Sequence, residues 1–303
     1  MVETTSFSNF LETIGVLATL VFVLTSMLGM GFSLTVPQII APLRNTKLVL
    51  LSLAANFILV PLLAVGILLI FPLSEGLSIG LFLVGTAAGA PFLPKLAQVA
   101  KGDTAFSVGL MVLLMMVTIL YVPIVLPLLL TGVTINPWDI ARSLILLMLI
   151  PLAIALFIRA RYEEVANGLL PLMNQATSLS LLVLFVAFFV VYISDLLGVI
   201  GSTAIVAAVL FLLISFIIGY FLGGSAGAIR SVLGLGTAQR NLSAALAIAA
   251  LNFTDPDVMV MIMVVSLAGL ILLMFIGGEL GKRAEAAAGD SHEQEKTPTA
   301  PSR

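Results

Sequence analysis

The stretch "IGLFLVGTAAGAPFLPKLAQVAKGD", Ile79 to Asp103, decides the fold of this chain. It starts as an apolar run fit to enter a lipid bilayer, yet Gly89, Pro91 and Pro94 fall within six residues near its middle. A proline cannot donate the helical backbone hydrogen bond, and its ring clashes with the preceding turn. The sequence therefore predicts a membrane helix that is broken near its centre.

The composition places the whole chain in a membrane. Hydrophobic residues make up 61% of the 303 positions and charged residues 9%, whereas roughly a quarter of a soluble domain is charged. Apolar runs, each about as long as the roughly 20 residues that a spanning helix needs, recur along the chain. We expect an all-α polytopic bundle over residues 1–281, followed by a disordered cytoplasmic tail at 282–303. Hydropathy, with Pro and Gly at the joints, predicts nine transmembrane helices at about 12–35, 48–71, 77–100, 104–131, 138–158, 168–193, 197–222, 231–253 and 258–281.

Several classes of function are excluded by residues that the sequence lacks. It has no cysteine, and its one histidine, His292, lies in the polar tail. Disulfides, thiolate metal sites and thiol nucleophiles are therefore excluded, and the sequence has neither a His-Glu-x-x-His motif nor a buried aspartate pair. We expect no enzyme activity, no cofactor and no nucleic-acid partner. Short loops and a short tail leave little room for a signalling module, which disfavours a membrane receptor.

Basic residues indicate the orientation of the chain. With nine crossings, ten of the 13 lysines and arginines fall on one side, and Arg142 is the only one near the other. Because cytoplasmic loops are enriched in lysine and arginine, we expect the N-terminus outside and the C-terminus in the cytoplasm. The first apolar run lacks the basic n-region and cleavage site of a signal peptide, so we expect it to stay as a helix in a bacterial inner membrane. The ten are Arg44, Lys47, Lys101, Arg159, Arg161, Arg230, Lys282, Arg283, Lys296 and Arg303.

Two basic residues, Lys95 and Arg240, fall inside predicted spans, whereas every Asp and Glu lies in a loop, a tail or a terminal turn. An arginine at a helix centre costs roughly 2.5 to 3.5 kcal/mol on insertion scales, so such residues are functional candidates. Arg240 could be bonded to freed backbone carbonyls, which would brace the structure, or to the carboxylate of a substrate. The sequence leaves both readings open. Lys95 lies six positions before Lys101, and its stem could instead snorkel to the inner face.

A second span repeats the interrupted pattern. "SVLGLGTAQRNLSAALAIAALNF", Ser231 to Phe253, carries the same Gly-Thr-Ala as residues 85–87, here at 236–238, five helices later. Paired interrupted helices are typical of inverted-repeat transporters, whose site lies where the two breaks meet. The odd count of nine places a missing helix at the N-terminus of the first repeat. The alternative is a chance match, because small residues are common in membrane helices.

Three stretches resemble the bile acid:sodium symporter family, in order and over almost the whole chain. "MLGMGFSLTVPQIIAPLRNTKLVLLSLAANFILVPLLA", residues 27–64, is similar to the family's Met-Gly-Leu-x-Leu turn, basic loop and next helix. "VGTAAGAPFLPKLAQVAKGDTAFSV", residues 84–108, resembles its first crossing helix and the loop after it. "GTAQRNLSAALAIAALNF", residues 236–253, resembles its second crossing helix.

The resemblance implies a panel and a core with two crossed, discontinuous helices. The spans at about 12–35, 138–158 and 168–193 would form the panel, and those within about 48–131 and 197–281 the core. It also implies transport of a small organic anion, such as a bile acid, a keto acid or a pantoate-like acid, through the lipid bilayer. The oligomeric state, including a homo-oligomer, stays open.

The departures from the family concern its sodium ligands. Aligned through "AALNF", the family's Glu position is Gly236, the Gln position is Arg240 and the Asn position is Asn241. A guanidinium thus replaces a sodium ligand and a carboxylate is missing. Like unit charges about 4 Å apart repel by roughly 4 kcal/mol at an effective dielectric of 20. At the first break the family's Ser-Asn pair falls on Leu93 and Pro94. On the next helix a Thr falls on Met111 while Ser107 keeps a hydroxyl, and on the helix before the break a Gln falls on Asn56.

The leading reading is a secondary transporter of a small organic anion whose sodium sites have degenerated. Arg240 would act as a fixed cation in place of sodium, and no metal site is expected. The alternative is a sodium symporter that holds sodium by other oxygens, such as Thr86, Thr237 and carbonyls. Asn174 and Gln175 would face the pathway or bond a neighbouring helix. The predicted substrate and crossover site comprises Arg240, Asn241, Gln239, Lys95, Asn56, Ser107, Thr86 and Thr237.

Overall fold

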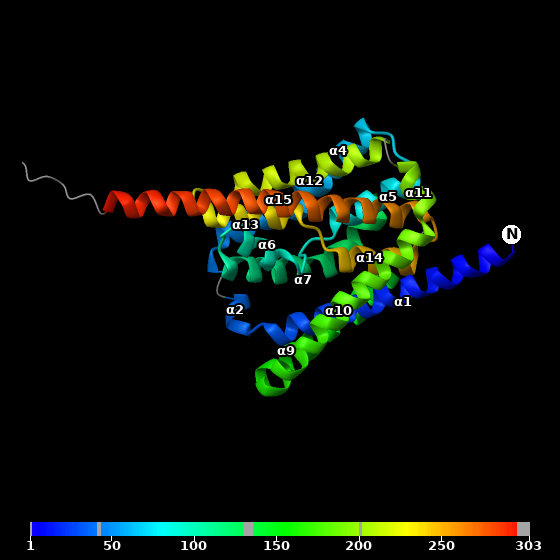
Figure 1. The fold of residues 1–303 in the computed structure, drawn as a ribbon, viewed down its shortest axis with the longest axis horizontal. Coiled ribbons are helices and arrows are strands. Elements are labelled where there is room, and N and C mark those ends of the chain that lie inside the picture. The colour runs from blue at the N-terminus through cyan, green and yellow to red at the C-terminus, as the bar shows by residue number, and fades with distance from the viewer. Residues whose placement is uncertain (1, 41–43, 130–135, 200–201, 296–303) are drawn as a thin grey trace, which may run out of the picture.

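The computed structural model describes residues 2–40, 44–129, 136–199 and 202–295, and within these ranges it contains helices and no strand. The long helices run side by side (Figure 1), with the N-terminus at one end of the bundle and the far end of α15 at the other. The end of the fourth predicted span, at 130–131, and residues 296–303 lie outside the described residues. The all-α prediction is confirmed for the part that is described.

Among the described residues, seven helical segments are long and apolar enough to cross a membrane. Two of them contain a π-helical turn between α-helical parts, and the shorter α2 (Val36–Ile40) and α11 (Ile193–Val199) lie between long segments. The seven are α1 (Val2–Ser33), α3 (Thr46–Ala54) with η2 (Ala55–Leu59) and α4 (Val60–Ile70), α7 (Thr104–Leu129), α8 (Pro137–Leu144) with η3 (Ile145–Leu149) and α9 (Ile150–Arg161), α10 (Glu163–Val191), α12 (Thr203–Leu222), and α15 (Pro256–Glu295).

The other two predicted spans are each divided into two shorter helices. α5 (Glu75–Thr86) and α6 (Leu93–Val99) cover the span predicted at 77–100, and α13 (Gly227–Ala238) and α14 (Leu242–Asn252) cover that at 231–253. The residue after α5, Ala87, and the residue after α13, Gln239, both have extended backbone. Both predicted breaks are therefore confirmed.

Proline explains the π-helical turn at η2. Pro61 is the second residue after this turn and has no N–H, so the carbonyl of Phe57 four residues earlier loses its helical donor. The hydroxyl of Tyr121 on α7 donates to that carbonyl at 2.7 Å. The wider turn, of a kind often found at functional sites, also carries the buried side chain of Asn56. Pro151 follows η3 in the same way.

The C-terminal tail differs from the prediction of disorder. α15 continues without a break through the basic residues to Glu295. The run "AEAAA" at 284–288 has a high helix propensity, and Lys282 pairs with Glu279 one turn earlier at 2.8 Å. Glu285 also reaches Lys101, after α6, at 3.1 Å. The disordered segment predicted at 282–303 is thus helical as far as it is described.

The helices form two groups of contacts. α1 packs along α10 and α9, and these three lie together below the other long helices in Figure 1. Gly31 on α1 allows this approach, since a Cβ there would lie 2.5 Å from the Cβ of Ala155 on α9. In the other group α5 packs on α15, and α12 packs on α13. The end of the bundle that carries Lys47, Lys101, Arg230 and Lys282 is called the basic end below.

Candidate functional site

The two helix breaks meet inside the bundle. The backbone N–H of Asn241, between α13 and α14, donates to the carbonyl of Ala87 at 2.9 Å. Its side-chain amide donates to the carbonyls of Ala88 at 3.3 Å and Gly89 at 3.0 Å, while its oxygen caps α14 through the N–H of Ala244. Asn241 is fully buried, so it supplies buried unwound backbone with the partners that such backbone requires. This meeting point is called the crossover.

Gly89 lets the first break pass close to α7. Its φ is +82°, and a Cβ there would lie 2.3 Å from the backbone nitrogen of Met115 and 2.7 Å from the carbonyl oxygen of Met111. Only glycine adopts this conformation at little cost and leaves room for both atoms. The Gly and Pro cluster therefore does more than break the helix. It also lets the broken segment pack directly against the α7 backbone.

Arg240 lies at the centre of the crossover and is 6% exposed. Its Nε donates to the carbonyl of Val84 at 3.0 Å, and its Nη2 donates to that of Gly85 at 2.8 Å. Its Nη1 donates to the carbonyl of Thr237 at 3.0 Å and to Oδ1 of Asn56 at 2.8 Å. One guanidinium thereby joins α5, α13 and η2.

The helix ends explain how a buried cation is held here without a carboxylate. Val84 and Gly85 belong to the last turn of α5, and Thr237 to the last turn of α13. Carbonyls of a last turn lack intrahelical donors, and a helix C-terminus carries partial negative charge that favours a cation. The planar fork of an arginine can reach several such oxygens at once. Two converging half-helix ends therefore take the place of a counter-ion.

Asn56 and Thr237 complete the surroundings of Arg240, and both are fully buried. The side-chain amide of Asn56 donates to the carbonyl of Ser52 at 3.0 Å and to the hydroxyl of Thr237 at 3.3 Å. Its oxygen is thereby turned toward the guanidinium. Four of the predicted site residues, Arg240, Asn241, Asn56 and Thr237, are brought together as expected.

The other four predicted site residues do not join this cluster. Thr86 and Ser107 are buried, but their hydroxyls donate only to carbonyls of their own helices. Gln239 is half-buried and caps α13 through its backbone N–H. Lys95 is exposed on α6, and among the described residues its side chain makes no hydrogen bond or ion pair with the cluster. The crossover cluster is therefore smaller than the predicted site.

The space beside Gly236 is filled by apolar side chains. A Cβ at Gly236 would lie 2.8 Å from a methyl group of Leu93 and 3.2 Å from one of Leu110. Leu93, Leu110 and Met111 are each 2% exposed or less. Pro94 follows Leu93 in the first turn of α6. Hard cations require oxygen ligands, and at these positions the side chains are apolar and packed against one another.

Thr118 on α7 holds the first break, and the sequence did not single it out. Its hydroxyl donates to the carbonyl of Ala88 and accepts from the N–H of the same residue, both at 3.0 Å. Together with Asn241 it replaces the helical bonds lost at the break. The only signal in the sequence was a hydroxyl in the middle of an apolar span, and such hydroxyls often bond their own helix instead.

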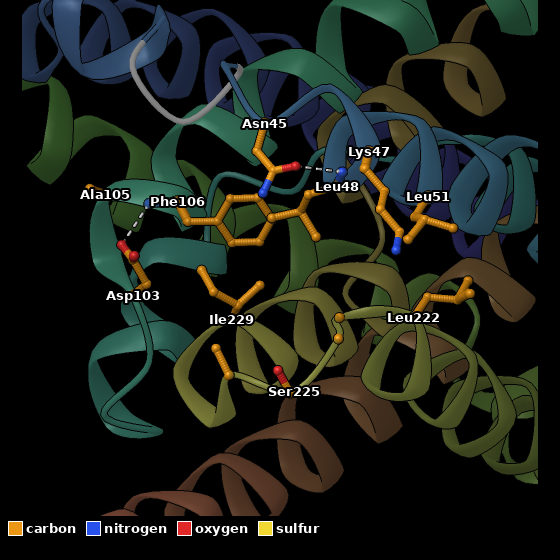
Figure 2. A pocket seen from close by; sticks show the side chains of 13 residues that line it. Asn45, Lys47, Leu48, Leu51, Asp103, Ala105, Phe106, Leu222, Ser225 and Ile229 are labelled. Atoms are coloured by element: carbon orange, nitrogen blue, oxygen red, sulfur yellow. Dashed lines mark hydrogen bonds between the residues drawn. The ribbon is translucent and has the colours of Figure 1, made fainter.

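A cavity lies at the basic end, and none of the residues that line it belongs to the crossover. It has a volume of about 510 Å³ and is bounded by the starts of α3 and α7 and by the turn between α12 and α13 (Figure 2). Asn45 accepts from the N–H of Leu48 at 3.1 Å, and Asp103 accepts from the N–H of Phe106 at 2.9 Å. These polar groups serve as helix caps, and the rest of the lining is mainly apolar.

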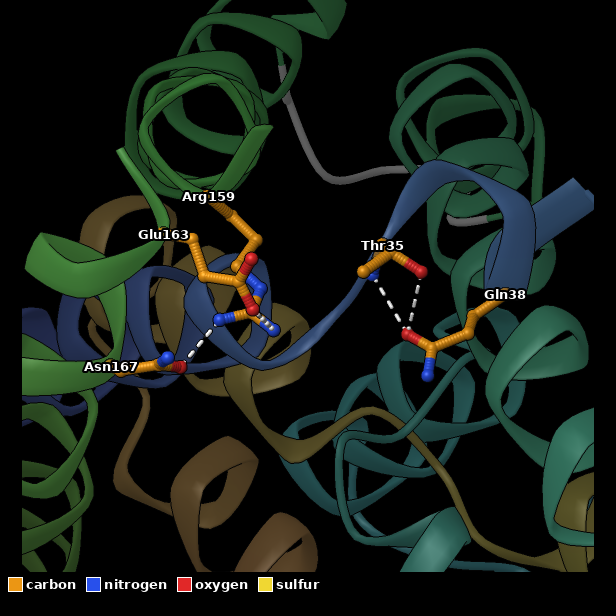
Figure 3. A network of polar contacts seen from close by, with 5 residues as sticks. All are labelled: Thr35, Gln38, Arg159, Glu163 and Asn167. Carbon is orange, nitrogen blue, oxygen red and sulfur yellow. Dashed lines mark hydrogen bonds and ion pairs between the residues drawn. The ribbon is translucent and has the colours of Figure 1, made fainter. Parts of the chain in front are cut away.

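A second polar network at the basic end ties α9 to α10. Arg159 pairs with Glu163 at 3.0 Å and donates to Asn167, while the N–H and hydroxyl of Thr35 both donate to Gln38 at 2.9 Å (Figure 3). Each of these contacts is local in sequence. The network secures helix ends and makes no described contact with the crossover.

Known proteins resemble the chain over most of this architecture. A sequence model of the Sodium Bile acid symporter family matches residues 19–220, which include the first break but end before α13. "Sodium/bile acid cotransporter 4" of Mus musculus is 26% identical over 205 residues, 64% of this chain and 46% of that protein. "Uncharacterized sodium-dependent transporter YocS" of Bacillus subtilis (strain 168) is 26% identical over 156 residues, 49% of this chain and 47% of that protein. The chain thus spans about half the length of the curated relatives it matches. The family is one of transporters and not of enzymes, and this chain belongs to the Sodium Bile acid symporter family.

Proposed function

We propose that the protein is a secondary transporter of a small organic anion in which Arg240 holds the crossover in place of a sodium ion. The observation that carries the proposal is the set of four oxygens, from Val84, Gly85, Thr237 and Asn56, to which the guanidinium donates. Carbonyl and amide oxygens are the ligands that a hard cation takes. In this crossover they are already bound to a cation that cannot leave.

The positive charge of Arg240 would repel a sodium ion bound beside it, which supports the proposal. Like unit charges about 4 Å apart repel by roughly 4 kcal/mol at an effective dielectric of 20. No Asp or Glu side chain pairs with Arg240 among the described residues, so nothing offsets that repulsion. A sodium ion would have to displace the guanidinium from its four oxygens.

The second sodium position is proposed to be lost through packing. The family's carboxylate position is Gly236, and its surroundings are the methyl groups of Leu93 and Leu110. A sodium ion there would be desolvated without oxygen ligands, which is strongly unfavourable. Sodium binding would therefore be removed at one position by a fixed cation and at the other by a hydrophobic core.

We further propose that Arg240 braces the crossover and does not bind the substrate. Four of its five N–H groups are occupied by protein oxygens, and the side chain is buried. A substrate carboxylate would have to break these bonds to reach it. Of the two readings left open by the sequence, the bonding pattern supports bracing.

The transport architecture is part of the proposal. α1, α9 and α10 would form the panel, in line with their mutual packing, and the helices of 48–129 and 203–281 the core. The broken pairs α5–α6 and α13–α14 would each cross the membrane once, which gives nine crossings related by an inverted repeat. The basic end would face the cytoplasm, in a bacterial inner membrane, with the N-terminus outside.

A sodium-coupled organic anion symporter is the second candidate. It is favoured by the names of the mouse and Bacillus relatives, both of which refer to sodium. Sodium would then need oxygens such as the hydroxyls of Thr86 and Thr237. The hydroxyl of Thr86 donates to carbonyls of its own helix and keeps its oxygen lone pairs, whereas the oxygen of Thr237 already accepts from Asn56, so sodium would share the Thr237 oxygen with that amide.

Uptake into proteoliposomes separates the two candidates. Labelled cholate, pantoate and a branched-chain 2-oxo acid serve as probes, because they are carboxylates of different size. The proposal expects uptake of at least one probe to be unchanged when sodium is replaced by potassium on both sides. Collapse of uptake in potassium would establish the sodium-coupled candidate instead. The exposed basic-end variant Arg283→Gln is the control for effects of surface charge.

A further inference from the structure

The two crossing helices can be compared position by position. When Gly85 is placed on Gly236 through the shared Gly-Thr-Ala, Phe92 corresponds to Ser243 and Lys95 to Leu246. Phe92, the N-cap residue of α6, lies three residues before Lys95, as Ser243 lies three residues before Leu246 on α14. Residues three apart share one face of a helix. The comparison therefore pairs one face of α6 with one face of α14.

The face on α14 is closed. Ser243 and Leu246 are each 1% exposed, and α14 packs against α1 and α8. The hydroxyl of Ser243 lies 3.4 Å from that of Ser26 on α1. This contact seals the crossover against the panel on the side of the N-terminus.

The equivalent face on α6 is open. Phe92 is 36% exposed and Lys95 is also exposed. α6 packs against α7, α13 and α15, and the described part of the chain shows no comparable packing against α1 or α8. One of two matched surfaces is thus closed on the panel while the other is open toward the basic end, which is the asymmetry of an alternating-access carrier in one of its two states.

The α10 helix indicates where the gap begins. Leu181 and Phe185 pack against the main core, whereas Asn174 and Ser178, which share their face at a spacing of seven residues, are exposed. The contact between the two groups therefore ends between Ser178 and Leu181 and opens toward the basic end. Asn174 lies beside Gly29 of α1, since a Cβ on that glycine would be 3.2 Å from its oxygen. Amide and hydroxyl groups thus lie on the panel side of the opening.

Lys95 is the basic residue that lies on the open face of α6. Arg240 is bonded to protein oxygens, and Lys101 pairs with Glu285 at the surface. Within the described ranges Lys95 takes part in no ion pair or side-chain hydrogen bond. In the opposite state α6 would close on the panel as α14 does now, and Lys95 would occupy an environment like that of buried Leu246. Burying an unpaired ammonium carries a large desolvation penalty.

We propose that a monoanionic substrate must neutralise Lys95 through its carboxylate before the α6 surface can close, so that the protein exchanges monoanions and the empty carrier does not return. The inference rests on the proposed transport function and adds that inward and outward movement of the anion are coupled. One free lysine matches one carboxylate, and the exposed ring of Phe92 offers an apolar contact beside it. A dicarboxylate would carry an unpaired charge into the closed state and is a poor substrate on the same reasoning.

Counterflow in proteoliposomes tests this rule. Labelled cholate and pantoate are offered to vesicles that are empty or loaded with the same unlabelled anion, with potassium on both sides. Wild type is expected to take up label at least tenfold faster into loaded vesicles. Lys95→Gln should reduce this ratio to below twofold, because the neutral side chain lets the empty carrier return. Lys95→Arg should keep the ratio, and Lys282→Gln, at an exposed lysine paired with Glu279, is the matched control.

The outcomes separate the inference from the function on which it rests. Equal wild-type rates into empty and loaded vesicles, or a Lys95→Gln protein that keeps the tenfold ratio, would overturn the inference while transport stands. The latter is the result expected of a lysine that merely snorkels to the membrane surface. A wild-type protein that carries none of the anions would defeat the proposed function itself, and the inference with it.

Discussion

Nη1 of Arg240 donates to Oδ1 of Asn56 at 2.8 Å, and this bond joins the second broken helix to a π-helical turn that lies far away in the sequence. The same nitrogen donates to the carbonyl of Thr237. The side chain thus fixes the relative position of α13, α5 and η2 from the centre of the crossover. A cation that is covalently part of the chain does this permanently, whereas a bound ion does so only while it is present.

Arg240→Gln should destabilise the protein strongly. A glutamine lacks the charge and most of the donors, so carbonyls of two helix ends would stay buried without partners. Hydrogen bonds to charged groups contribute roughly 1.5 to 3 kcal/mol each, and we expect a loss of about 3 kcal/mol or more. Thermal unfolding in detergent measures it, with Arg283→Gln as the exposed control, for which a change within about 0.5 kcal/mol is expected. Equal melting temperatures for the two variants would contradict a bracing role.

Thr118→Val tests the hydroxyl that supports the first break. Valine has nearly the same shape but leaves both the N–H and the carbonyl of Ala88 without this partner. A buried group left unsatisfied costs roughly 1 to 3 kcal/mol, and the same unfolding measurement should show a loss in that range. Thr86→Val is the matched control, because that hydroxyl bonds only its own helix. If the control loses as much stability as Thr118→Val, the break does not depend on Thr118.

Gly89→Ala should be severely destabilising, because alanine at φ +82° is disfavoured and its Cβ would meet the α7 backbone. The left-handed backbone alone costs roughly 1 to 2 kcal/mol. Gly66→Ala, in the interior of α4 with nothing within 4 Å of the new Cβ, should instead gain about 0.5 to 1 kcal/mol. Relative to wild type, the unfolding temperature should fall in Gly89→Ala and rise in Gly66→Ala. If Gly89→Ala leaves the unfolding temperature unchanged, Gly89 does not pack against the α7 backbone as described.

Single cysteines report the open and closed surfaces directly, because the chain has none of its own. In membrane vesicles, Phe92→Cys should react with an impermeant thiol reagent applied from the side of the basic end, because α6 is open there. Ser243→Cys should be protected from both sides while it packs on Ser26. Fast labelling of Ser243→Cys together with protection of Phe92→Cys would show that the protein rests in the opposite state.

Much of the crossover could be predicted from the sequence because its determinants are local. Pro91, Pro94 and Gly89 break a helix wherever it packs, and a guanidinium in an apolar span must find oxygens. Asn56 and Thr237 were expected in the same site as Arg240, and both accept hydrogen bonds from its guanidinium. The apolar central parts of the long helices followed from hydropathy in the same way, whereas α1 begins before and α15 ends after the predicted spans.

The partners that the sequence did not reveal depend on tertiary contacts. Thr118 reaches Ala88 because α7 is pressed against Gly89, and Tyr121 reaches Phe57 because Pro61 frees that carbonyl. Ser107 and Thr86 were expected in the site, but each satisfies its hydroxyl within its own helix, which competes with any longer contact. The tail was predicted to be disordered because it is short and charged, although its alanine-rich run favours a helix.

Direct sodium binding tests the central claim without a known substrate. Radioactive sodium is equilibrated with purified protein in potassium buffer, in parallel with the Bacillus relative whose name refers to sodium. Because Arg240 occupies the oxygens at the crossover and Leu93 with Leu110 fills the space beside Gly236, no saturable binding is expected for this protein. Saturable binding that unlabelled sodium displaces and potassium does not would contradict the replacement of sodium by Arg240.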